Sequence, residues 1–502
     1  STSPLTAVGL LVIRVLPTDL VKFAIALFGE ADKIVLILTV GAGGLVLGGL
    51  IGGLLRTRPR LALLAFTAAE AGLVLLVGLR PEAGPVDLAA AVGGSLLGAL
   101  AFALLLGVVG SRRVGRRART TTPVDEDTRA DAEAPAGTDA PAPGDGLGRR
   151  GFLLLAGASA MVGAIGIAAG RTVVAVGRGA AEATRRFVLP APAVASPPVP
   201  AGAEVGVDGV APFTTAQADL YRIDTALVPP AVDPDAWELR VDGLVEEPFT
   251  LTFDDLLAMR LEEHRITLTC VSNPVGGDLV GTGTWTGVPV RTLLARAKPL
   301  PDADMVLSHS IDGFTASTPL EAMTDGRASL VAVGMNGEPL TPEHGYPVRL
   351  IVPGLYGFVS ATKWVTRLEV TRFDRAEAYW TQRGWDARAP ILVASRIDVP
   401  RGLERVAAGE VVVAGSAWAQ QSGIAAVEVR LDDGEWTAAD LGTEANADTW
   451  RQWRTTLPDV EPGRHAVAVR AVDRDGTVQT HERRDPIPNA ATGHHRVEFR
   501  AE

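Results

Sequence analysis

The first third of the chain alternates between long apolar runs and short charged segments. Four runs are long enough to cross a bilayer as helices, and glycine and alanine are frequent in them, as helix packing in lipid favours. These runs are residues 34–55, 61–79, 88–110 and 152–170. A further stretch, 5–28, is interrupted by charged residues and a proline, which indicates an amphipathic or broken segment near the interface. The pattern predicts an α-helical transmembrane domain over residues 1–119; with the run at 152–170 it gives four spans, or five if 5–28 also crosses.

Arginine residues set the expected orientation of these spans. They gather between the first two runs, after the third run and directly before the fourth. Cytoplasmic loops carry the excess of basic residues in membrane proteins. The arginine-rich loops are therefore expected in the cytoplasm, and the fourth span should run outward. Everything after about residue 180 is then expected outside the cytoplasm.

Between the third and fourth runs lies a segment without large apolar residues. Residues 120–148 are rich in Pro, Ala, Gly, Asp and Thr, which predicts a disordered linker. Arg149-Arg150 then precedes Phe152 and an apolar stretch, a pattern typical of a twin-arginine export signal. Ordinary flanking charge is the alternative explanation. No small-residue cleavage site stands out, so 149–176 is expected to remain as a signal-anchor helix.

The remaining chain changes its pattern twice. The proline-rich residues 177–212 predict an extended spacer that holds the next domain away from the membrane. Short strands with interspersed helices, such as a strand at 237–243 and a helix at 252–259 capped by Thr252, predict an α+β domain over 213–389. Short alternating strands joined by Asp-Gly and Pro-Gly turns then predict an immunoglobulin-like β-sandwich over 390–502. These strands are expected at 410–417, 426–431, 450–457 and 465–472.

Charge and histidine placement exclude some functions. The formal net charge of −11 argues against a nucleic-acid partner, which needs a basic footprint. All seven histidines lie after residue 260, and the membrane region has no cysteine. That region therefore cannot hold haem through histidine pairs or attach it covalently, and no haem is expected in this chain. Glu70, inside the second run, is either a proton or quinone site or a carboxylate that faces a neighbouring helix.

The only cysteine of the chain, Cys270, stands at a point where the pattern changes abruptly. The alternating residues 264–269 predict a strand, and the Asn-Pro and Gly-Gly pairs after Cys270 predict a loop. A strand end that delivers one thiol into such a loop suits a metal ligand, because a thiolate is a soft, strong donor. The alternative is a small buried hydrophobic residue.

Several blocks resemble the sulfite oxidase family. They are Leu268-Thr269-Cys270-Val271-Ser272-Asn273, Trp285-Thr286-Gly287-Val288-Pro289, Met335-Asn336-Gly337-Glu338-Pro339-Leu340, His344-Gly345-Tyr346-Pro347-Val348-Arg349, Val352-Pro353-Gly354 and Lys363-Trp364. The resemblance covers about residues 215 to 502 and implies that Cys270 ligates molybdenum beside a pterin dithiolene. It implies two-electron oxygen-atom transfer, with water supplying or accepting the oxygen. Such a cofactor would be inserted in the cytoplasm, which favours the export signal for folded cargo.

The resemblance also implies roles for other residues. His344 and Arg349 match cofactor-binding positions, Lys363 falls in the family's Lys-Trp stretch, and Asn273 follows the ligand in the cofactor loop. Cationic side chains are what a pterin phosphate needs. Without the resemblance, a capping histidine and two surface cations would be the plainer interpretation.

On the substrate side, Arg222 matches an arginine that faces the metal and an anionic substrate. A salt bridge of Arg222 to Asp219 or Asp224 is the alternative. Trp385 stands where the family has a tyrosine near the metal. The family's sulfite oxidases follow the cysteine with Gly-Asn-Arg-Arg, whereas this chain has Ser272-Asn273-Pro274-Val275. The departure predicts a less positive, more aromatic pocket.

The sequence leaves three hypotheses for the function. The first is a multi-pass, membrane-anchored molybdenum oxidoreductase with an extracytoplasmic catalytic domain, a small-molecule substrate and a separate electron carrier: a cytochrome, a partner subunit or a quinone. The second is a quinol-fed reductase of oxidised sulfur or N-oxide compounds. The third is a non-enzymatic membrane scaffold. Lipid contact is expected in each, and because the family's C-terminal domain mediates dimerisation, a homodimer is expected too.

The export hypothesis predicts the outcome of one conservative change. Replacing Arg149 and Arg150 together by Lys keeps the positive charge, so topology set by charge alone would not change. A twin-arginine signal would instead fail, and residues 200–502 would stay in the cytoplasm. Protease shaving of intact cells measures the exposure of this region. Normal exposure in the double variant would reject the export signal.

Overall fold

The computed structural model describes residues 32–78 and 187–502, together with isolated positions between 8 and 16 and between 88 and 99. The chain forms two compact units, Ser1–Val176 and Gly177–Glu502. The expected linker 120–148, the Arg149-Arg150 signal and the expected span 152–170 lie outside the described residues, as do the segment 5–28 and the span 88–110 apart from isolated positions.

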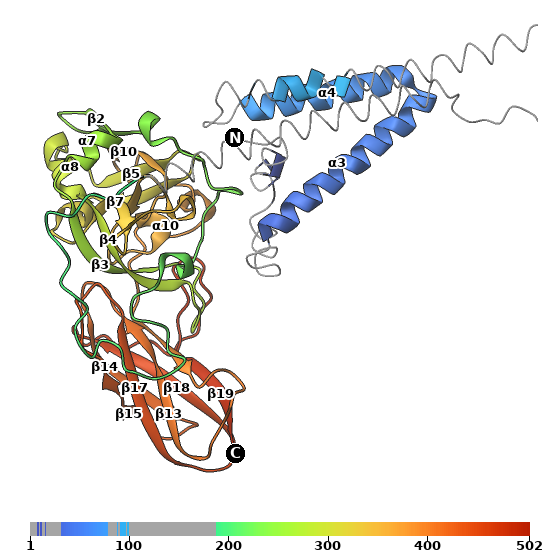
Figure 1. The fold of residues 1–502 in the computed structure, drawn as a ribbon. Coiled ribbons are helices and arrows are strands. Elements are labelled where there is room, and N and C mark those ends of the chain that lie inside the picture. Colours follow the sequence, from blue (N-terminus) through green and yellow to red (C-terminus); the bar gives the residue numbers. More distant parts are fainter. Residues whose placement is uncertain are drawn as a thin grey trace, which may run out of the picture. The chain divides into compact units, whose positions relative to one another are not determined.

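Two long apolar helices make up the described part of the first unit. They are α3 (Asp32–Thr57) and α4 (Pro59–Gly78), which pack against each other through Ile51, Ala62 and neighbouring apolar side chains (Figure 1). Proline at the first position of α4 costs no hydrogen bond, because that amide has no partner within the helix. Both helices are long and apolar enough to cross a membrane, as expected for the first two runs. Glu70 lies within α4.

The first part of the second unit contains two sheets with short helices between strands. The first sheet has the order β2 (Phe249–Thr252), β1 (Glu238–Gly243), β10 (Val365–Thr371), β5 (Met305–Ser310) and β6 (Thr315–Pro319). The second has the order β3 (Glu262–Thr269), β4 (Val280–Pro289), β7 (Leu330–Met335) and β8 (Glu338–Pro339), and β9 (Arg349–Ile351) also pairs with β7. The helices are α7 (Phe253–Leu257), α8 (Val290–Ala297), α9 (Leu320–Thr324) and α10 (Gly357–Ser360). This is the α+β domain that the sequence predicted, with Thr252 as the cap of α7.

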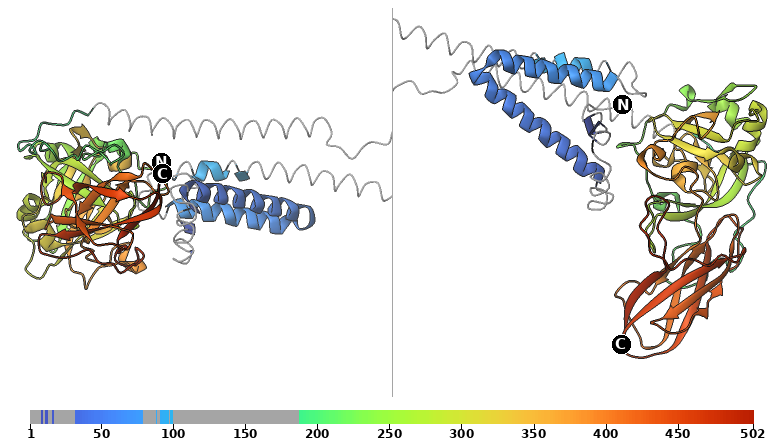
Figure 2. Two further views of the ribbon diagram at one scale, coloured as in Figure 1. Left: turned by 90° about the horizontal axis from the view of Figure 1, so that it is seen from below. Right: turned by 180° about the vertical axis from the view of Figure 1, so that it is seen from behind.

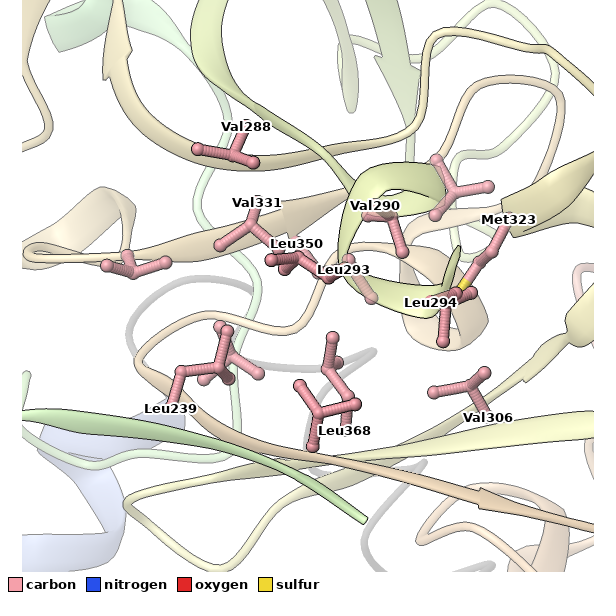
Figure 3. Packing of buried hydrophobic residues seen from close by; sticks show 14 of the residues in the cluster. Leu239, Val288, Val290, Leu293, Leu294, Val306, Met323, Val331, Leu350 and Leu368 are labelled. Carbon is pink, nitrogen blue, oxygen red and sulfur yellow. The ribbon is translucent and has the colours of Figure 1, made fainter. Parts of the chain in front are cut away.

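A hydrophobic core lies between these two sheets. Figure 3 shows Val288, Val331 and Leu350 of the second sheet facing Leu239, Leu368 and Val306 of the first. Helix α8 closes the core, because its buried residues recur at the spacing of one helix face. These are Val290, Leu293, Leu294 and Ala297. The core fixes both sheets, and with them the strand ends that carry the candidate site.

The C-terminal region consists of two sheets around a second core (Figure 2). One sheet has the order β11 (Ala394–Val399), β13 (Gly409–Trp418), β17 (Arg451–Val460) and β16 (Asp440–Leu441). The other has the order β12 (Arg405–Val406), β19 (His495–Ala501), β18 (Gly463–Asp473), β14 (Ile424–Leu431) and β15 (Thr437–Ala438). The four strands predicted from the alternating pattern correspond to β13, β14, β17 and β18.

The proline-rich residues 187–212 pack against other parts of the second unit. They are extended, as their composition predicts, but Ala203 is buried in one cluster with Trp418 and Trp450. The amide nitrogen of Val205 donates to Gln452 at 3.0 Å. This part of the chain therefore differs from the free spacer predicted from its prolines, because its alanines and backbone amides find partners on the C-terminal region.

Strand β3 has β4 on one side only, so its other edge needs partners. Main-chain groups of residues 193 and 194 cover the first half of that edge. The C-terminal region covers the second half: the Thr267 amide donates to the Asp448 carbonyl at 2.9 Å, and Gln420 donates to the Thr267 carbonyl. Gln420 also accepts from the Gly354 amide at 3.1 Å. An unpaired strand edge is free to pair with another chain. These hydrogen bonds, called the edge seal, cover that edge and hold the strand that ends at Cys270.

Removing the edge seal should weaken the second unit. Gln420→Ala removes the acceptor of the Gly354 amide and one donor to the Thr267 carbonyl. The loss should lower the free energy of unfolding by about 2 kcal/mol. Such a loss lowers the melting temperature by about 4 °C in a domain of this size, measurable by differential scanning fluorimetry of the detergent-solubilised chain. The matched control is Gln421→Ala, whose exposed amide pairs only with the Asp448 side chain. Equal shifts in the two variants would contradict the role of Gln420.

Candidate functional site

Cys270 follows the last residue of β3 and begins a tight loop. Its amide donates to the Leu279 carbonyl at 2.9 Å, and its carbonyl accepts from the Asn273 amide at 3.1 Å. The side chain of Asn273 accepts from the Leu279 amide at 3.0 Å, which closes the loop across its base. At Gly276, with φ +80°, a Cβ atom would collide with the His495 ring of β19. Backbone contacts therefore fix the thiol from both sides.

Burial controls the charge of this thiol. It raises the pKa of Cys270, while the amide and hydroxyl of Ser272, which hydrogen-bond the sulfur, oppose the shift. The free side chain is therefore a neutral thiol, and a metal is needed to hold it as thiolate. Cys270 belongs to none of the hydrophobic clusters of the described residues and lines two cavities instead. That placement favours a ligand over a packing residue.

The first cavity, of about 90 Å³, gathers buried basic side chains together with the carboxylates Asp224 and Asp312. His344 ends the 3₁₀ helix η4 (Pro342–His344), Arg349 begins β9, and Lys363 lies in the turn before β10. Lys363 donates to Asp224 at 2.5 Å and to the Glu343 carbonyl at 3.0 Å. Arg349 donates to the His344 carbonyl at 3.2 Å. Lys363 is 8% exposed and Arg349 6%, so neither is a surface cation.

Burial disfavours the charged form of each basic side chain in this cavity. Burial, then the charges of Arg349, Lys363 and Arg222, lower the pKa of His344 to about 4. Burial lowers the pKa of Arg349 to about 10, and that of Lys363 to about 8 although Asp224 opposes the shift. The Nε of Arg349 is buried with no hydrogen-bond partner in the described structure. Such a group of donors calls for an anionic ligand.

Arg222 and Trp385 lie beside this cavity rather than on its wall. Arg222 Nε pairs with Asp224 at 2.9 Å, so the salt-bridge alternative is present, yet its Nη2 is buried with no hydrogen-bond partner in the described part of the chain. Trp385 packs against Phe358 and Trp380, which do line the cavity, with ring centroids at 5.7 and 6.1 Å. Asn273 lines the other cavity.

The second cavity, of about 190 Å³, lies between the Cys270 loop and the C-terminal region. The C-terminal region contributes Trp418 at the end of β13 and residues 477–480, 484 and 491–493 between β18 and β19. Tyr356 also lines it, and burial raises its pKa to about 12, so it remains a neutral phenol. The lining residues of the C-terminal region had no local signal in the sequence, because they lie more than a hundred positions from Cys270 and reach it only through the contact between the two regions.

The residues present suit a molybdopterin cofactor. In the described part of the chain, no three His, Cys, Asp or Glu side chains come together as a metal site. A metal at Cys270 must therefore take most of its ligands from a cofactor. The buried cations of the neighbouring cavity supply donors for a phosphate on such a cofactor. The geometry thus brings a buried thiol and a group of buried hydrogen-bond donors to one place.

Comparisons with known proteins agree with this geometry. Residues 226–380 match the family model of the oxidoreductase molybdopterin binding domain. An uncharacterized oxidoreductase, YuiH, of Bacillus subtilis is 34% identical over 166 residues, which are 33% of this chain and 80% of the relative. Sulfite oxidase of Gallus gallus is 30% identical over 311 residues, covering 52% of this chain and 67% of the relative.

A solved structure shows the same fold. The sulfane dehydrogenase SoxCD from Paracoccus pantotrophus superposes with a TM-score of 0.51 at 24% identity, over 58% of this chain and 84% of that chain. The fold and the matching domain define a molybdopterin-binding oxidoreductase. The chain belongs to the sulfite oxidase family, and it is a molybdenum-dependent enzyme.

Proposed function

We propose that the chain is a membrane-anchored, extracytoplasmic molybdopterin oxidoreductase that transfers oxygen atoms and exchanges electrons with a separate carrier. The observation that carries this proposal is the place of Cys270, where a buried cationic cavity and a second, less charged cavity meet. One cavity suits the anionic part of a cofactor, and the other leaves room for a substrate at the same sulfur.

The roles of the residues follow from their chemistry. Lys363, Arg349 and His344 hold the phosphate of the pterin, and Cys270 ligates the metal. The bound cofactor supplies two-electron oxygen-atom transfer. Ser272 donates two hydrogen bonds to the Cys270 sulfur, which stabilises the thiolate. Arg222, through its unpaired Nη2, and the aromatic group around Trp385 shape the rim of the cofactor cavity.

The membrane anchor rests on separate support. The helices α3 and α4 are long and apolar enough to span a bilayer, and arginines flank the apolar runs. With all seven histidines after residue 260 and one cysteine at 270, the membrane segments contain no histidine or cysteine to hold a haem. A cytochrome, partner subunit or quinone therefore exchanges the electrons. The C-terminal sheets form an immunoglobulin-like domain that dimerises the chain.

A reductase of oxidised sulfur or N-oxide compounds, fed by quinol, is the second candidate. The second cavity favours it, because none of the described residues that line this cavity is acidic and only Arg484 is basic. A reductase substrate with a neutral S–O or N–O group suits such a wall better than a dianion does.

The proposed ligand has a direct test. In Cys270→Ser a hydroxyl replaces the thiolate, and a hydroxyl is a much poorer ligand for molybdenum. We expect activity with redox dyes to fall at least about 1,000-fold, while the circular dichroism spectrum stays unchanged. Metal analysis of the wild-type chain should find molybdenum near one per chain. Full activity in the serine variant, or a wild-type chain purified without molybdenum, would contradict the proposal.

The pocket charge predicts poor turnover of sulfite. A site tuned to a small dianion gathers several cations, but Pro274 and Val275 stand where the family's sulfite oxidases have two arginines. We expect kcat/KM for sulfite to lie well below about 10⁶ M⁻¹s⁻¹, the range of efficient enzymes. Steady-state kinetics on the metal-loaded chain with an artificial electron acceptor measures this value. A value above that limit would overturn the prediction.

A further inference from the structure

The loop that begins at Cys270 is held by two side chains of the C-terminal region. Arg396 of β11 donates from its Nη1 to the Gly277 carbonyl at 3.1 Å. The ring of His495, at the start of β19, lies so close to Gly276 that an added Cβ atom would come within 2.2 Å of it. Both contacts reach the loop away from its base, which the strands β3 and β4 hold.

The guanidinium of Arg396 is itself fixed in place. Its Nε lies 2.6 Å from Asp398 Oδ1, and the two side chains are only 9% and 10% exposed. Asp398 also accepts from the Ala211 amide at 3.2 Å, so the carboxylate is anchored as well. The guanidinium lies over the Trp450 ring, 5.8 Å from its centroid. Because the guanidinium is planar and rigid, this setting directs one N–H at the loop.

His495 is a neutral stop for the same loop. Its Nδ1 accepts from the Ile397 amide at 2.9 Å, so this nitrogen carries no proton. Burial, and then the charge of Arg396, lower the pKa of His495 to about 4, and the ring stays uncharged at neutral pH. The ring limits how closely Gly276 can approach β19, and the hydrogen bond from Arg396 limits how far the loop can move away.

Stability alone is a weak explanation for the buried pair of Arg396 and Asp398. Taking two charges out of water costs desolvation energy, and apolar residues of the same size often stabilise a protein as well or better. What a buried pair can provide is a fixed direction for its remaining hydrogen-bond donors. Here that direction ends on the loop that carries the thiol.

We propose that Arg396 is a positioning residue for Cys270, and that its hydrogen bond to the Gly277 carbonyl holds the ligand loop in the conformation that the metal requires. This inference rests on the proposed function, in which Cys270 ligates the metal. Arg396 is not among the residues that line either of the two described cavities, so it acts through the loop and not on the substrate. Groups that hold a metal ligand from behind typically change activity about 10-fold to 100-fold when they are removed.

The test compares Arg396→Met with Arg451→Met in the purified full-length, molybdenum-loaded chain. Arg451 is the matched control, because it also donates to main-chain carbonyls, those of Gly442 and Ile424 at 2.8 and 2.9 Å, but within the C-terminal region. Hydrogen exchange followed by mass spectrometry measures the opening of residues 270–279. We expect exchange there to become about tenfold faster in Arg396→Met, as the loss of one hydrogen bond allows, and to stay unchanged in the control.

A second readout reports on the ligand itself. Redox titration gives the midpoint potential of the metal centre, which the groups behind a ligand influence. A loosened thiolate donates less charge to the oxidised metal, so the potential should rise in Arg396→Met and stay constant in Arg451→Met. Turnover with redox dyes should fall about tenfold in Arg396→Met only. A purely structural role would lower the melting temperature without moving the potential.

A variant that keeps the charge guards against misfolding. If Arg396→Met does not fold, Arg396→Lys takes its place, because it leaves a cation beside Asp398. A single ammonium lacks the planar fork that reaches both Asp398 and the Gly277 carbonyl. We therefore expect faster exchange of residues 270–279 and a raised potential in this variant too, with a melting temperature close to that of the wild type.

The outcomes distinguish this inference from the proposed function. Unchanged exchange of residues 270–279, or an unchanged potential, in a folded and molybdenum-loaded variant would overturn the positioning role and leave the oxidoreductase intact. Equal changes in Arg451→Met would also overturn it. A wild-type chain purified without molybdenum would instead overturn the proposed function. Faster exchange of the loop in the Arg396 variant of such a chain would still support the hold of Arg396 on the loop, and unchanged exchange would reject it.

Discussion

The candidate site depends on the hydrogen bonds that seal the outer edge of β3. This strand carries Cys270 at its end, and β4 satisfies only one of its edges. The other edge takes its partners from residues 193 and 194 over its first half and from Gln420 and Asp448 of the C-terminal region over its second half. The C-terminal region therefore has a part in placing the thiol, besides any contact it makes with another chain. A ligand to a metal must be held to within a fraction of an ångström, and edge pairing supplies that rigidity.

The separation of charge around Cys270 follows from this placement. On one side the sulfur adjoins the cavity of His344, Arg349 and Lys363, where burial lowers the pKa of all three basic side chains and two carboxylates, Asp224 and Asp312, also line the wall. On the other side it adjoins a wall almost free of charge. Buried charges cost desolvation energy even when they are paired, and an anionic ligand would offset part of that cost. Binding of an anionic cofactor would therefore stabilise this cavity, where the buried charges are costly in the protein alone.

How much the sequence predicted depends on how local each signal is. The strand that ends at Cys270, the capped helix α7 and the alternating strands β13, β14, β17 and β18 were predicted because their patterns span fewer than a dozen residues. The resemblance to one family then brought His344, Arg349 and Lys363 together with Cys270, and the structure places all four on one cavity. The roles of Arg222, Asn273 and Trp385 remain predictions. The docking of residues 187–212 and the part of Trp418 and Thr269 in a cavity wall had no local signal, because they arise from contacts between distant segments.

Under the proposed function, the contact between the α+β domain and the C-terminal region divides the site into a cofactor side and a substrate side. The basic residues proposed to hold the cofactor come from η4, β9 and the turn before β10, all within the α+β domain. The second cavity takes much of its wall from the C-terminal region, including the segment between β18 and β19. Substitutions in that segment alter the charge and shape met by a substrate while the core between the two sheets of the α+β domain stays intact. In the proposed function, the α+β domain therefore holds the cofactor and the C-terminal region contributes to the choice of substrate.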